Sequence, residues 1–105
     1  MHGRRRLSPV AGFAPLAEGE RWTYAGALTH ANAGNALAAA DELPLPAAGE
    51  IDLRGIGAVD SAAVAVLLAL KRRAAAETRP LQFAHVPAAL AALADLYGVE
   101  EILGT

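Results

Sequence analysis

The chain contains no cysteine, which excludes disulfide bonds, thiolate catalysis and sulfur-ligated metal sites. Lysine and arginine are not concentrated anywhere after the first few residues, and the formal net charge is −2. A nucleic-acid-binding surface needs a basic patch, so we expect no nucleic-acid partner. The lack of cysteine also suits a cytoplasmic protein.

Long hydrophobic runs are missing too. The longest, residues 62–70, falls well short of the ~20 apolar residues that span a bilayer. The N-terminal segment is basic, but Pro9, Gly12 and Pro15 interrupt it before an apolar export-signal core can form. We therefore expect no direct membrane insertion, and we predict that residues 1–12 form a flexible basic tail without an assigned role.

Catalytic and metal-binding motifs are likewise absent from the sequence. The glycine-containing stretch 54–59 lacks the Lys-Ser/Thr pair of a phosphate-binding loop. The histidines show no spacing typical of a zinc site or a catalytic triad. We expect no catalytic residue, no metal and no cofactor, and predict ordinary positions for the histidines: His2 in the tail, His30 on the surface of a helix start, His85 at a strand end.

The chain does have enough apolar residues for one folded domain. It is 105 residues long and 54% hydrophobic, although much of that share is alanine, which buries little surface per residue. Leu, Val and Ile must therefore supply the core, and residues 13–105 are expected to fold as a single unit. These residues cluster in 51–53, 64–70, 81–86 and 90–99.

The first half of the chain predicts a hairpin, a helix and a strand. Residues 13–16 and 21–28 are predicted to form two antiparallel strands, which a turn at 18–20 joins. Residues 30–43 read as a helix that Thr29 caps and Pro44 ends. Residues 50–54 then alternate as a strand with one buried face, and the two glycines of 54–59 predict a loop after it.

The second half predicts a long helix, a strand and a last helix. The long helix begins at Ser61 or Ala62, with Asp60 or Ser61 as its cap, and ends near Ala76. Residues 81–86 form a strand, and Pro87 opens a helix that Gly98 stops. Residues 99–103 would add a turn or short strand. In the last helix one face is expected to carry Leu90, Leu93, Leu96 and Tyr97.

This order predicts an α/β fold, β-β-α-β-α-β-α, because a strand-helix-strand run implies parallel neighbours while the opening hairpin is antiparallel. The sheet should therefore be small and mixed. In so small a domain the helices should cover mainly one of its faces.

Ser61 is the residue for which chemistry leaves two interpretations open. A hydroxyl at a helix start can cap the helix, a role worth ~1 kcal/mol for which Asp60 competes. It can instead accept a phosphate or contact a partner, since unpaired backbone N–H groups and the positive helix end attract anions. The neighbouring Asp60 carboxylate would repel such a phosphate.

Residues 51–68 resemble the signature of STAS domains, in which a strand and loop lead into Asp-Ser/Thr at the start of a helix. The strand end Gly-Ala-Leu-Thr at 26–29 is similar to the same family, and the resemblance covers residues 13–103. It implies the STAS-like α/β fold. The position that is usually glycine in the family is Ala63, followed by Val64 in place of leucine.

Within the family the chain looks closest to the stand-alone cytoplasmic STAS subunit of the Mla phospholipid-transport ABC complex. That resemblance implies a non-catalytic accessory subunit that binds the transporter ATPase and meets the membrane through the complex. The alternative is an anti-sigma-factor antagonist whose Ser61 is phosphorylated by a kinase partner, and a weak homodimer stays open in both cases. The resemblance and the helix start together predict partner contacts at Asp60, Ser61, Ala62, Ala63 and Ala65.

Overall fold

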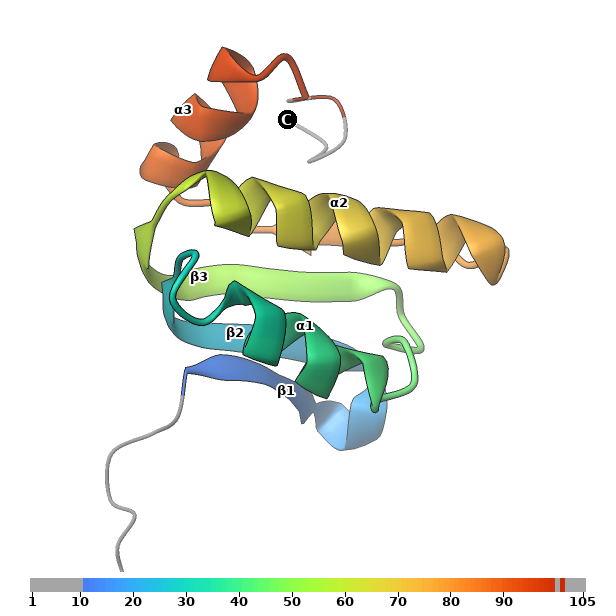
Figure 1. Cartoon of the computed structure of the whole chain (residues 1–105). Coiled ribbons are helices and arrows are strands. Elements are labelled where there is room, and N and C mark those ends of the chain that lie inside the picture. Colours follow the sequence, from blue (N-terminus) through green and yellow to red (C-terminus); the bar gives the residue numbers. More distant parts are fainter. Residues whose placement is uncertain (1–10, 100, 102–105) are drawn as a thin grey trace, which may run out of the picture.

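A computed structural model describes residues 11–99 and 101, which form a mixed α/β domain in the predicted order β-β-α-β-α-β-α. The sheet strands pair in chain order (Figure 1). β1 is antiparallel to β2, and β2, β3 and β4 are parallel, so the predicted mixed sheet is confirmed. The strands are β1 (Gly12–Leu16), β2 (Arg21–Leu28), β3 (Glu50–Val59) and β4 (Gln82–Ala84).

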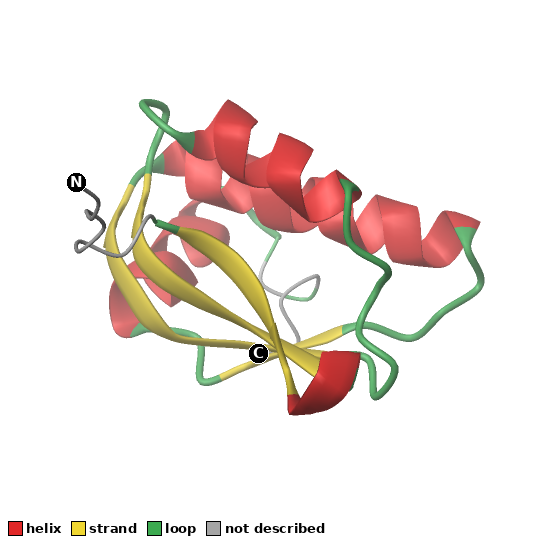
Figure 2. Ribbon diagram, turned by 90° about the horizontal axis from the view of Figure 1, so that it is seen from below, coloured by secondary structure: helices red, strands yellow, loops and turns green. Residues whose placement is uncertain are grey.

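Within residues 11–99 the α-helices are α1 (Ala33–Asp41), α2 (Ser61–Ala76) and α3 (Ala88–Leu96). Figure 2 shows α1 and α2 on one face of the sheet, with the strands exposed on the other. α2 contacts both α1 and α3, and α3 lies over the first half of α2 (Figure 1). No helix in the described part of the chain is long and apolar enough to cross a membrane.

The core lies between the sheet and the helices. β2 and β3 alternate along it, so Trp22 and Tyr24 point inward beside Ile51 and Leu53 while the residues between them point out. From the other side the core is closed by the fully buried Leu67, Leu70 and Leu90. The alanines at the α1 interface permit close packing because they add little bulk.

Arg73 joins two of the helices. Its guanidinium donates to the carbonyl oxygens of Ala40, at 3.1 Å, and Leu43, at 2.6 Å, and also pairs with Glu77 one turn further along α2. The Ala40 carbonyl at the C-terminal end of α1 also accepts from the backbone N–H of Leu43 at 3.0 Å, so Arg73 adds a second donor there. Arg73 therefore links the last turn of α2 to the C-terminal end of α1.

The β1–β2 turn is left-handed. The three residues Ala17, Glu18 and Gly19 have φ values of 51°, 58° and 90°. Glycine adopts this conformation without a steric cost, but a residue with a Cβ is strained by roughly 1–2 kcal/mol. The hairpin predicted around this turn is confirmed, and its two non-glycine residues are strained.

Replacing Glu18 with glycine should therefore raise the free energy of unfolding by up to about 1 kcal/mol, because relief of strain exceeds the extra flexibility of the unfolded chain. Glu20→Gly is the matched control, since Glu20 has φ −66° and gains nothing from glycine. Chemical denaturation of both variants checks this. Equal destabilisation by the two changes would contradict it.

β3 is longer than predicted. The loop expected at 54–59 is strand, and the pairing with β2 continues to Leu28 and Val59 through two register shifts. Gly55 permits this continuation, because a Cβ there would lie 2.5 Å from the Tyr24 carbonyl oxygen. The glycines thus allow two backbones to approach, and the prediction of a loop from them was wrong.

α1 is shorter than predicted, because Thr29 does not cap it. Residues 29–32 form a turn in which the Thr29 N–H donates to Asn32 Oδ1 at 2.9 Å and the Thr29 carbonyl accepts from Asn32 and Ala33. Asn32 also donates to the Ala27 carbonyl at 2.9 Å. Short polar side chains compete with helical backbone bonds, and here that competition delays the helix.

The C-terminal part of the domain differs from the prediction in two ways. β4 has three residues, fewer than the predicted strand 81–86, because the chain turns at His85, where φ is 57°. The expected apolar face of α3 is only partly buried: Leu90 is enclosed, but Leu96 and Tyr97 are 74% and 55% exposed. The predicted face of the last helix therefore contributes only part of its residues to the core.

The expected domain boundary concerns residues that the structure describes only in part. Gly12, predicted to end the tail, is the first residue of β1. Residues 1–10 of the basic tail predicted at 1–12 lie outside the described residues, and so do most residues of the turn or strand predicted at 99–103.

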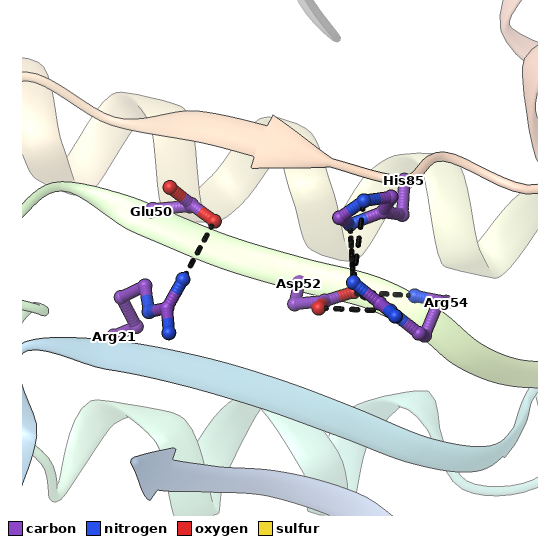
Figure 3. Close-up of polar contacts among 5 residues, drawn as sticks. All are labelled: Arg21, Glu50, Asp52, Arg54 and His85. Carbon is purple, nitrogen blue, oxygen red and sulfur yellow. Dashed lines mark hydrogen bonds and ion pairs between the residues drawn. The ribbon is translucent and has the colours of Figure 1, made fainter. Parts of the chain in front are cut away.

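The helix-free face of the sheet carries paired charges (Figure 3). Arg21 on β2 lies 3.6 Å from Glu50, and Arg54 binds Asp52 through its side-chain Nε at 3.1 Å and its backbone N–H at 2.9 Å. His85 Nδ1 lies 3.4 Å from Asp52 Oδ1. Arg54 Nη2 is 3.2 Å from both ring nitrogens of His85, so the guanidinium lies over the face of the ring. Each of these five side chains therefore has a charged or polar partner within the group.

Asp52 makes the stability of the domain sensitive to acid. The backbone N–H of Arg54, followed by the charges of Arg54 and His85, holds the pKa of Asp52 below its ordinary value of 3.8. A carboxyl with a lowered folded-state pKa stabilises the fold fully above its unfolded value. That contribution is lost as the pH falls through the folded value.

We expect Asp52→Asn to flatten the loss of stability below about pH 4 relative to the wild type, measured by urea denaturation at a series of pH values. Arg54→Met should keep more of the pH dependence of stability than Asp52→Asn does. The methionine variant retains the backbone N–H at position 54, which has the largest effect on the Asp52 pKa. Identical pH profiles for Asp52→Asn and the wild type would contradict this expectation.

Candidate functional site

The candidate site forms where β2 and β3 end side by side. These strands are parallel, and the last pair in their register joins Leu28 to Val59. The residues that follow each strand therefore meet at the same edge of the sheet, the position where α/β proteins commonly place functional groups. The turn at 29–32 thus lies beside the Asp60–Ser61 junction.

Asp60 organises this junction. Its backbone is extended, and its Oδ1 accepts from the Ala62 N–H at 2.8 Å, so Asp60 is the cap of α2. Its Oδ2 accepts from the backbone N–H of His30 at 3.0 Å and lies 2.9 Å from His30 Nδ1. These bonds, with the His30 backbone contributing most, lower the pKa of Asp60 below 3.8.

Ser61 is left free by this arrangement. Because Asp60 takes the capping role, α2 does not need the Ser61 hydroxyl, and none of the hydrogen bonds among residues 11–99 uses it. Ser61 is exposed at the first position of α2. Of the two capping candidates that the sequence left open, the structure selects Asp60.

The other predicted contact residues divide between the surface and the core. Ala65 is exposed one turn after Ser61, and Ala62 is half-buried. Ala63 is fully buried, so its methyl group packs into the core and is unavailable to a partner. The substitution of alanine for the usual glycine therefore affects the interior and leaves the exposed face unchanged.

A shallow apolar groove of about 250 Å³ begins at Ser61. One wall is formed by Ser61, Val64, Ala65 and Leu68 of α2, and the other contains Tyr97 and Val99 after α3. We call Asp60, Ser61 and this groove the Ser61 site. An exposed hydroxyl at the end of an apolar groove can position a partner side chain, because the groove supplies burial and the hydroxyl supplies direction.

Sequence reasoning missed His30, which binds Asp60, and four residues that line the groove: Val64, Leu68, Tyr97 and Val99. His30 was predicted as simple helix-start surface, Val64 and Leu68 as core, Tyr97 as part of the apolar face of the last helix, and Val99 as part of a terminal turn. A signal for His30 exists, since it follows a strand that runs parallel to β3 and must therefore end near Asp60. For Tyr97 the signal is its position next to Gly98, which ends the helix, because side chains at a helix end are less covered by neighbouring elements.

The geometry provides no catalytic arrangement at Ser61. The Nδ1 atom of His30 faces Asp60, and no hydrogen bond in residues 11–99 gives Ser61 a general base. His85 lies apart from this junction, on the open face with Asp52 and Arg54. Among residues 11–99 and 101, no group of His, Asp and Glu side chains is arranged to hold a metal ion.

The fold and site define a small mixed α/β domain with an exposed serine at the start of its second helix. A family model described as "Mlab, STAS domain" matches residues 22–104, which is most of the chain. The chain belongs to the STAS domain family, whose members are generally non-catalytic protein-interaction domains. No curated protein matches the chain.

Proposed function

We propose that this protein is an accessory subunit of an ABC-type intermembrane phospholipid transport system and that it binds the ATPase of that system through the Ser61 site. It would act in the cytoplasm, at the membrane through the complex, and catalyse no reaction. The observation that carries this proposal is the release of Ser61 from helix capping by Asp60, which leaves its hydroxyl exposed beside an apolar groove.

Several features support a protein partner at this site. Leu96 and Tyr97 are the most exposed large apolar side chains in the described residues, and Tyr97 lines the groove. Apolar residues beside a polar anchor are typical of interface centres. The match to a family model described as an Mlab STAS domain favours a transporter ATPase as the partner.

An anti-sigma-factor antagonist is the second candidate, and the exposure of Ser61 favours it. A phosphate on this hydroxyl would meet the positive end of α2 but also the Asp60 carboxylate, which already serves as the cap. The added charge would therefore weaken a complex that forms with the unmodified serine. This candidate predicts reversible phosphorylation at Ser61 and a kinase as the partner.

Affinity purification from the native cells separates these candidates. Mass spectrometry would identify the co-purifying proteins and measure the phosphate on Ser61. Recovery of an ABC ATPase and permease with unmodified Ser61 supports the transport proposal. Recovery of a kinase with phosphorylated Ser61 would replace it with the switch.

Ser61→Glu should weaken binding of the recovered ATPase at least about tenfold, because the larger charged side chain fills the end of the groove and lies beside Asp60. Ser61→Ala should fold and bind with little loss. Thr78→Glu is the matched control, since Thr78 is an exposed hydroxyl residue just beyond the opposite end of α2. Undiminished binding by both Ser61 variants would remove Ser61 from the interface.

A further inference from the structure

His30 donates twice to one carboxylate oxygen. Its backbone N–H and its ring Nδ1 lie 3.0 Å and 2.9 Å from Asp60 Oδ2. An ionised carboxylate only accepts hydrogen bonds, so Nδ1 must carry the hydrogen in this contact. In the neutral ring the other nitrogen, Nε2, is then a bare acceptor. The side chain is 87% exposed, so Nε2 is available to another molecule.

We propose that His30 is a pH-dependent recognition residue of the Ser61 site, which accepts a hydrogen bond from the partner through Nε2 when its ring is neutral. This inference rests on the proposed function. Protonation of the ring turns Nε2 into a donor, which opposes the same partner group. The bond from Nδ1 to Asp60 persists in the neutral and the protonated ring. The ring therefore stays in place while Nε2 changes from acceptor to donor.

Within the described residues, the ring of His30 faces a single charged partner. Asp60, at the junction of β3 and α2, is the charged group that faces the ring, and no other ion pair in residues 11–99 includes His30. On β2, Tyr24 is the titratable group in the hydrogen-bond network of the neighbouring turn. Its hydroxyl donates to the Ala27 carbonyl at 2.7 Å and accepts from Asn32. No ion pair links His30 to α1 or α3 within the described residues.

The tautomer can be tested on the full chain without a partner. Long-range ¹H–¹⁵N NMR across the titration should show neutral His30 protonated at Nδ1, and Asp60→Asn should reduce that preference. His85 provides the internal comparison within the same spectra. A neutral ring protonated at Nε2 in the wild type would overturn the proposal even if the ATPase binds.

The second test measures binding of the purified transporter ATPase at about pH 8, where histidine is neutral, and again at about pH 6. Wild-type affinity should fall about tenfold in acid, as expected when one hydrogen bond is lost and two donors oppose each other. His30→Asn keeps an amide donor for Asp60 but lacks Nε2, so its affinity should be lower at pH 8 and flat with pH. His85→Asn should retain the wild-type profile.

An unchanged pH profile in His30→Asn would overturn the role of His30 while leaving the proposed function intact. Absence of ATPase binding at every pH would overturn the proposed function instead. The same pH series with the anti-sigma kinase would then decide the role of His30 through the same comparison of wild type and His30→Asn.

Discussion

Gly49→Ala should lower the free energy of unfolding by about 2–5 kcal/mol, through left-handed strain and overpacking together. Gly49 has φ +72°, and an added Cβ would lie 2.7 Å from the carbonyl oxygen of Pro80. The backbone has little room to move away. Its N–H donates to Pro46 at 2.9 Å and its carbonyl accepts from Gln82, the first residue of β4, at 2.8 Å.

Gly34→Ala is the matched control for this experiment. Gly34 lies inside α1, its φ is not positive, and no atom is within 4 Å of an added Cβ. Alanine should therefore stabilise the domain there by about 0.5–1 kcal/mol. Guanidinium denaturation of both variants gives the comparison, and wild-type stability in Gly49→Ala would show that the chain from Pro46 to Gln82 is not held as described.

Leu67→Ala should cost a similar amount, about 2–5 kcal/mol, because the cavity left by a fully buried leucine is only partly filled by relaxation. Leu67 lies on the face of α2 that packs against the sheet. The loss is large against the ~5–15 kcal/mol that stabilises an ordinary domain. The thermal midpoint should therefore fall by many degrees.

Leu96→Ala makes the same chemical change at a site that is 74% exposed. Its effect on stability should stay within about 0.5 kcal/mol. Thermal and chemical denaturation of the two leucine variants separate burial from side-chain chemistry. Equal losses in both would mean that Leu96 is covered in solution.

Sequence patterns predicted the element order and the location of the core, because alternating and helical spacings record which side of each element is buried. They were less successful at 54–59, where glycine predicted a loop although it permits close strand pairing. They also missed the turn after β2, because the side-chain bonds of Asn32 act against helical propensity. Such effects depend on contacts between segments, which local spacing does not contain.

The candidate site was predictable only in outline. The position of Ser61 at a helix start followed from the sequence, but its release from capping depends on the extended backbone of Asp60. The link from His30 to Asp60 requires the register of two parallel strands, with Leu28 level with Val59. Whether an alanine faces a partner or the core depends on the rotation of α2, which placed Ala63 inside and Ala65 outside.

The order of the strands in the sheet has a consequence for how this protein is made. From β2 to β4, each strand in the described part of the chain pairs with the one that precedes it, so none of these strands needs a partner that is synthesised later. The hairpin of β1 and β2 can form first, and β3 and β4 can then add to its edge in turn. Such near-neighbour pairing limits loop-closure entropy and favours fast folding. During synthesis on the ribosome the sheet can therefore grow in the direction of translation.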